Sequence, residues 1–130
     1  MNILVNLGTL LTAVALFQLK HFVCDFVLQT KYQVEKKRIY GHPGGILHAG
    51  LHALFSIPAL LFLALAPMMV AAFVVAEFLV HYHVDWAKAQ IDERAGWTSD
   101  KQAYWIIFGL DQFIHQVTYV VMIAIVYCGV

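Results

Sequence analysis

Charged residues are scarce in this sequence. They make up 12% of the 130-residue chain, whereas a soluble globular domain has about 25%. Hydrophobic residues make up 62%, a fraction that excludes an ordinary water-soluble domain and indicates a protein of the lipid bilayer. Basic and acidic residues number eight each, so the charge balance points to no charged macromolecule, and we expect no nucleic-acid partner.

Cysteine and nucleophilic serine motifs are also lacking. The two cysteines, Cys24 and Cys128, have no metal-motif spacing. We expect them toward opposite faces of a membrane, which argues against a disulfide. No serine nucleophile motif is present, and Ser56 is interpreted as a packing residue. Covalent serine or cysteine catalysis is therefore not favoured.

Proline is rare, and one of the three prolines divides the longest apolar stretch. Pro67 follows Ala66 and breaks a helix there, because proline cannot donate a backbone hydrogen bond and disfavours a helical residue before it. A spanning helix needs roughly 20 apolar residues. We predict an all-α protein, a single domain over residues 1–130, whose four transmembrane helices cover Asn2–Gln29, Gly45–Leu65, Met68–Lys88 and Gln102–Tyr127.

The basic residues predict the topology of this four-helix bundle. All but Lys20 lie in or beside the first and third connections: Lys31, Lys36, Lys37, Arg38, Lys88, Arg94 and Lys101. Positive charge marks the cytoplasmic side, so both termini are expected on the non-cytoplasmic side of a bacterial inner membrane. A cleaved signal peptide is the competing interpretation of the first segment. That segment lacks a basic n-region and is too long for a signal peptide.

Ionisable side chains recur at a spacing of four residues in all four apolar stretches. On a helix this spacing places both members of a pair on one face. A central Asp in a membrane helix costs about 2.5–3.5 kcal/mol, so these groups need partners, water or a cation. The pairs are His21 and Asp25, His48 and His52, His81 and Asp85, and Asp111 and His115.

All four pairs fall in the cytoplasmic halves of their predicted spans, and the outer halves are almost wholly apolar. This segregation predicts one clustered site, and all eight residues are candidate metal ligands. These ligands offer nitrogen and oxygen donors but no thiolate, and such a set suits one or two divalent ions. Zinc is the metal we expect, and iron and manganese are the alternatives. Glu77 lies one turn before His81 and is the candidate general base. Glutamines such as Gln29 and Gln112 are expected to orient the ligating imidazoles.

A plainer interpretation applies to each histidine taken singly, because intramembrane histidines often hydrogen-bond across helices. It applies best to His83, which points away from the face of His81, and to His42, which lies in a turn. A proton relay or an ion path also places acidic and imidazole groups in a membrane. These alternatives stay open.

Together these motifs resemble a family of small bacterial and phage integral membrane proteins, the domain of unknown function 3307. The residues that carry the resemblance are the run from His21 to Thr30, the His48–His52 pair, His81 through Asp85 to Lys88, and the run from Asp111 to His115. The family carries no assigned activity. The His48–His52 pair is also distantly similar to inner-membrane metal-dependent hydrolases.

Two classes of function follow from this reading. The leading prediction is a metal-dependent hydrolase that acts on a membrane lipid or other amphiphile at the cytoplasmic leaflet, by direct attack of water. The alternative is a non-enzymatic protein, either a metal or proton handler or an accessory subunit of a transporter, with a structural metal or a polar hydrogen-bond cluster. A homo-oligomer is compatible with both.

Overall fold

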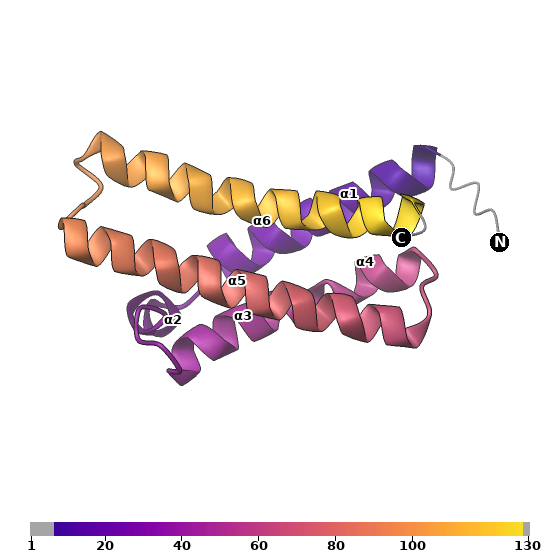
Figure 1. Ribbon diagram of the computed structural model, residues 1–130, viewed down its shortest axis with the longest axis horizontal. Helices are drawn as coiled ribbons and strands as arrows, with labels where there is room; N and C mark the ends of the chain where they lie inside the picture. Colours follow the sequence, from indigo (N-terminus) through magenta and orange to yellow (C-terminus); the bar gives the residue numbers. More distant parts are fainter. Residues whose placement is uncertain (1–6, 129–130) are drawn as a thin grey trace.

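The computed structural model describes residues 7–128, and the side chains of residues 7–127. All the regular structure in this range is helical (Figure 1). The elements in chain order are α1 (Leu7–Phe22), η1 (Val23–Val27), α2 (Lys31–Lys36), α3 (Pro43–Phe55), α4 (Ile57–Phe62), α5 (Pro67–Ala95) and α6 (Gln102–Cys128).

Four helical rods are long and apolar enough to cross a membrane, as predicted. They cover Leu7–Val27, Pro43–Phe62, Pro67–Ala95 and Gln102–Tyr127. The predicted start of the first span, at residues 2–6, lies outside the described residues. The third rod continues seven residues past Lys88, and it ends at Gly96, whose φ of 63° is the left-handed conformation typical of glycine after a helix.

The rods form an antiparallel bundle with two distinct ends (Figure 1). The helices α5 and α6 lie side by side and are joined at the end of the bundle that also carries α2. We call this the α2 end. The start of α1, the end of α6 and the short α4–α5 turn lie at the other end, which we call the termini end.

The termini half of the bundle is packed with apolar side chains. The buried cluster includes Phe17, Leu60, Phe73 and Ile123, one from each rod, and Phe17 stacks on Tyr119 with ring centroids 5.1 Å apart. Large apolar residues elsewhere point outward, as lipid-facing residues do. The four ionisable pairs lie between this apolar cluster and the α2 end of the bundle.

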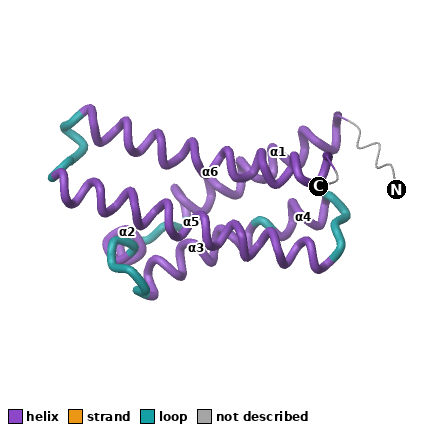
Figure 2. The backbone as a smooth tube through the Cα atoms, in the orientation of Figure 1, coloured by secondary structure: helices purple, strands orange, loops and turns teal. Residues whose placement is uncertain are grey.

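The second rod is broken at Ser56, between α3 and α4 (Figure 2). Pro58 has no backbone N–H to donate, which favours a break in the preceding turn. The Ser56 N–H bonds the carbonyl of Ala53 at 3.3 Å rather than the carbonyl of His52, its ordinary α-helical partner. The carbonyl of His52 is therefore free to accept other hydrogen bonds.

The short helix α2 holds the first connection against α3. Thr30 and Gln33 form a reciprocal capping box at its start. Gly44 permits close approach, because a Cβ at this position would lie 2.7 Å from Cβ of Lys36. This tight contact anchors Lys37 and Arg38, which follow α2, over the α2 end of the bundle.

Candidate metal centre

The four predicted pairs meet at one level of the bundle. Seven of the eight side chains are buried, and Asp25 is partly buried. Ring and carboxylate contacts connect all four rods at this level, so the predicted convergence is found. Two overlapping groups within this cluster can each hold a metal ion.

The first group consists of Asp25, His48, His52 and His81, whose donor atoms all lie within 4.8 Å of one another. Oδ1 of Asp25 is 3.0 Å from Nε2 of His52 and 3.2 Å from Nε2 of His48. Nε2 of His48 is 3.3 Å from Nε2 of His81. Tetrahedral zinc with bonds of about 2.0–2.1 Å separates its ligands by about 3.4 Å, so these spacings suit a bound ion.

The second group consists of His81, Asp85 and His115. Nε2 of His115 is 3.5 Å from Oδ1 of Asp85, and Nε2 of His81 is 3.6 Å from Oδ2 of Asp85. Asp111 lies outside the group but beside it, because its Oδ1 is 3.3 Å from Nε2 of His115.

The two groups are joined through His81 and Asp85. His81 belongs to both groups. The two carboxylate oxygens of Asp85 face different partners: Oδ2 is 3.1 Å from Nε2 of His48, and Oδ1 is directed to His115. A carboxylate placed in this way can bridge two ions, as inward carboxylates do in helical bundles with two metals.

Several buried polar atoms of the cluster have no hydrogen-bond partner among the described residues. They include Nε2 of His115, Oδ1 of Asp111, and Nδ1 of both His52 and His81. His115 and Asp111 face each other at ion-pair distance, yet without the geometry of a hydrogen bond. Buried polar atoms without partners are costly and uncommon. A bound cation would satisfy the oxygen of Asp111 and the ring nitrogen of His115, so the residues fit a metal ion.

His21 is, with Asp111, one of two predicted ligands that lie outside both groups. Its two ring nitrogens bond other side chains: Nε2 donates to Oε1 of Gln112 at 2.8 Å, and Nδ1 accepts from the hydroxyl of Tyr119 at 3.0 Å. Gln112 in turn donates to Oδ2 of Asp25 at 3.0 Å. His21 and Gln112 therefore orient Asp25, whereas the sequence analysis expected Gln112 to orient an imidazole.

Gln29 has a similar role on the other side of the centre. Its amide lies 3.0 Å from Nε2 of His48, as the sequence analysis expected of the glutamines. His83 and His42 are not part of the centre: His83 is exposed, and His42 caps the start of α3 by accepting from the N–H of Gly44. Both outcomes agree with the interpretation given to them above.

Lys37 reaches the centre from outside the spanning helices. Its Nζ is 3.2 Å from Oδ2 of Asp85. Burial disfavours the ammonium form, but the nearby carboxylates of Asp85, Asp111 and Asp25 outweigh this effect and raise the pKa of Lys37 above its ordinary value. Sequence reasoning missed this contact, because Lys37 sits in a cluster of flanking basic residues.

Glu77 is bound by Lys20, one turn below the centre toward the termini end. Oε1 of Glu77 accepts from Nζ of Lys20, which also donates to the freed carbonyl of His52 at 3.1 Å. The side chains of Lys20 and Glu77 are 6% and 2% exposed, and the Lys20 ammonium lies 4.3 Å from the centre of the Tyr119 ring. Among the described residues, the side chain of Glu77 forms no hydrogen bond or ion pair with the ligand groups, and its role as a general base stays a prediction.

A π-helical turn carries Asp25. The first rod changes from α-helix to π-helix over Val23–Val27, and the N–H of Leu28 bonds the carbonyl of Val23 at 2.9 Å. Such turns are rare and occur frequently at functional sites. The α-helical spacing of His21 and Asp25 gave no indication of this turn.

The fold and the site together define a helical membrane protein of four spans with a buried histidine and aspartate centre. The chain belongs to the family described as "Protein of unknown function (DUF3307)", whose model matches residues 13–130. No curated protein and no solved structure matches the chain. The family assignment predicted from the motifs is confirmed, whereas the origin in bacteria or phages and the distant similarity to hydrolases stay predictions.

Proposed function

We propose that this protein is a metal-dependent hydrolase that cleaves a membrane lipid or other amphiphile. The observation that carries the proposal is the pair of overlapping groups that share His81, with a donor set of imidazole and carboxylate only. Zinc is the proposed metal, as one or two ions, and iron and manganese are compatible with the same donors. A bound divalent ion lowers the pKa of a coordinated water toward neutrality and polarises a substrate oxygen.

The residues of the chain have distinct roles in this proposal. His48, His52 and His81 supply ligands with Asp25, and Asp85 connects them to His115. Gln112 holds Asp25 in place. Asp111 is the proposed proton acceptor in place of Glu77, because its Oδ1 has no hydrogen-bond partner in the part of the chain that the structure describes and faces the second group. Glu77 instead binds the ammonium of Lys20, which also donates to the carbonyl of His52.

The proposed location is the cytoplasmic leaflet of a bacterial inner membrane, with both termini on the opposite side. Support comes from the basic residues of the α2 segment, which include Lys31, Lys36 and Arg38. They lie at the α2 end, where the α5–α6 connection with Lys101 is also found (Figure 1). Cytoplasmic flanks are enriched in such residues, so the centre would lie within reach of the cytoplasmic head groups.

The second candidate is a metal or proton handler without enzymatic activity. The buried Lys20–Glu77 pair favours it, because the pair extends the polar groups one turn toward the termini end. The apolar cluster of Leu60, Phe73 and Ile123 lies beyond this pair. A path within one copy would have to cross this cluster, so conduction requires a second copy or a partner.

Proteoliposomes separate the two candidates. We expect wild-type protein to release a lipid cleavage product without ion flux, and we expect Asp111→Ala or treatment with a chelator to abolish the release. The variant Val120→Ala is the matched control on the same helix, since Val120 is exposed and lies outside the centre. Ion flux without lipid cleavage would overturn the hydrolase and support the handler.

A further inference from the structure

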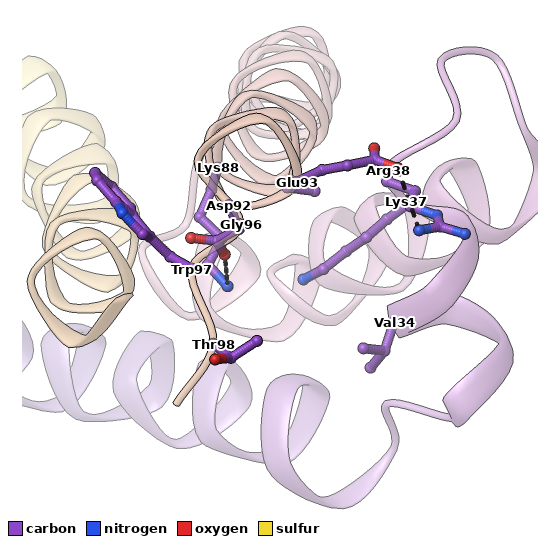
Figure 3. Close-up of a pocket in the computed structure, with 10 residues that line it drawn as sticks. Val34, Lys37, Arg38, Lys88, Asp92, Glu93, Gly96, Trp97 and Thr98 are labelled. Carbon is purple, nitrogen blue, oxygen red and sulfur yellow. Dashed lines mark hydrogen bonds and ion pairs between the residues drawn. The ribbon is translucent and has the colours of Figure 1, made fainter. Parts of the chain in front are cut away.

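A basic cleft lies at the α2 end of the bundle, beside the proposed metal centre. Its volume is about 380 Å³, and it is bounded by the segment after α2, the last turns of α5 and the connection to α6. The basic side chains in its wall are Lys37, Arg38 and Lys88, and Trp97 lies at its rim (Figure 3). Pockets for small ligands have volumes of about 300–1,000 Å³, so this cleft has the size for a lipid head group rather than a whole lipid.

The wall of the cleft carries one more basic than acidic side chain, because Asp92 and Glu93 also line it. Lys88 is paired with Asp92 at 2.8 Å, and Arg38 is paired with Glu93 at 3.4 Å. The Arg38 pair is half exposed on both sides and is therefore weak. Lys37 is the third cation, and it is extended across the cleft (Figure 3) to Asp85. A divalent ion held by Asp85 would repel this ammonium and would leave it available to an anion in the cleft.

Two apolar hollows continue from this cleft along the seam between α5 and α6. The first, of about 130 Å³, shares Lys88 with the cleft and is also lined by Asp111 and Ile114. The second, of about 290 Å³, shares Ile114 with the first and extends to Phe73. The cleft and the two hollows are therefore neighbours: Lys88 separates the cleft from the first hollow, and Ile114 separates the first hollow from the second.

The length of this line suits an acyl chain. Phe73 and Lys88 are 15 residues apart on α5, which corresponds to about 22 Å at about 1.5 Å per residue. One leaflet of the hydrocarbon core is about 15 Å thick, half of about 30 Å. The seam is thus long enough to take a chain from the head-group level past the middle of the bilayer.

We propose that the substrate is an anionic phospholipid whose phosphate lies in the cleft of Lys37, Arg38 and Lys88 and whose acyl chain lies along the α5–α6 seam. This placement rests on the proposed hydrolase. Asp111 lines the hollow where head group and chain meet, so the bonds between phosphate and chain lie beside the centre. The inference names the lipid class and its orientation, which the metal groups alone leave open.

Native mass spectrometry of the purified protein in detergent tests this inference. The probes are phosphatidylglycerol, zwitterionic phosphatidylcholine and inorganic phosphate, and the metal content of each sample is measured in parallel. We expect phosphatidylglycerol to bind more tightly than the other two. A basic residue near the membrane surface contributes about 1 kcal/mol, so Lys88→Gln should weaken phosphatidylglycerol binding about fivefold, and Ile114→Trp should block the seam.

Two control variants keep the result specific. Lys101→Gln removes an exposed lysine of the same connection that pairs with Asp100 outside the cleft. Val120→Trp adds the same bulk to an exposed position of α6 that does not line the seam. Neither control should change lipid binding.

The outcomes distinguish this inference from the proposed function. Equal binding of the two lipids, tight binding of inorganic phosphate alone, or an unchanged affinity in Ile114→Trp would overturn the lipid placement while the metal content stays as predicted. Protein without metal that still prefers phosphatidylglycerol would overturn the hydrolase and support the lipid site.

Discussion

The buried Lys20–Glu77 pair makes a strong prediction about stability. Lys20 holds three partners at once: the carboxylate of Glu77, the carbonyl of His52 and the ring of Tyr119. Replacing Lys20 with Met keeps most of the length of the side chain and removes the charge. Glu77 is then left as a buried carboxylate whose second oxygen, Oε2, also has no partner in the described part of the chain.

The expected cost follows from this loss of compensation. Removing one member of a buried ion pair costs about 3–5 kcal/mol, mostly because the other charge stays buried without a partner. The loss of the contact with the Tyr119 ring, worth up to about 2 kcal/mol in a desolvated setting, is part of the same change and is not added to it. We therefore expect Lys20→Met to lower the free energy of unfolding by about 3–5 kcal/mol.

The double variant Lys20→Met with Glu77→Leu should recover most of this loss, since a buried ion pair can often be replaced by apolar side chains without cost. The assay is unfolding in mixed micelles of mild detergent and dodecyl sulfate, followed by circular dichroism. Arg38→Met is the matched control, because Arg38 and Glu93 are 53% and 54% exposed and such pairs contribute about 0–1 kcal/mol. The reasoning is refuted if Lys20→Met costs less than about 1 kcal/mol, or if the double variant is no more stable than the single one.

Two further predictions concern packing and the ligand supports. Gly44→Ala should destabilise the protein by about 1–3 kcal/mol, because the new Cβ would lie 2.7 Å from Cβ of Lys36. The control is Gly50→Ala, where a Cβ would have no atom within 4 Å. This control should be neutral or stabilising in the same unfolding assay. Gln112→Leu should weaken zinc binding about 10–100-fold because Asp25 loses its donor, and titration calorimetry that finds Gln112→Leu equal to the control Gln116→Leu would contradict this.

The sequence predicted the four spans and the convergence of their ionisable residues for a clear physical reason. The pairs repeat at helical spacing in stretches where a charge is costly, so His48 with His52 and His81 with Asp85 had to face inward. The boundaries were less well determined. The third helix continues through Ala95 because nothing between Lys88 and Gly96 disfavours a helix.

The parts that sequence reasoning missed depend on contacts between distant segments. Lys20 looked like a basic residue near the end of a span, and only the packed bundle brings it to Glu77, 57 positions away. The partner of Asp85 was missed in the same way. Lys88, which is close to Asp85 in the sequence, pairs with Asp92, and the lysine that contacts Asp85 is Lys37 from the first connection. The π-helical turn at Asp25 likewise has no counterpart in the spacing of residues.

The metal content of the purified protein tests the central claim most directly. Elemental analysis by mass spectrometry should find one or two equivalents of a divalent metal in the wild type. His81→Ala, which removes the residue shared by both groups, should lose most of it, and His83→Ala, on the same helix but exposed, should retain it. Folded wild-type protein that binds no metal when supplied with zinc, iron or manganese, or equal metal content in the two variants, would contradict the account.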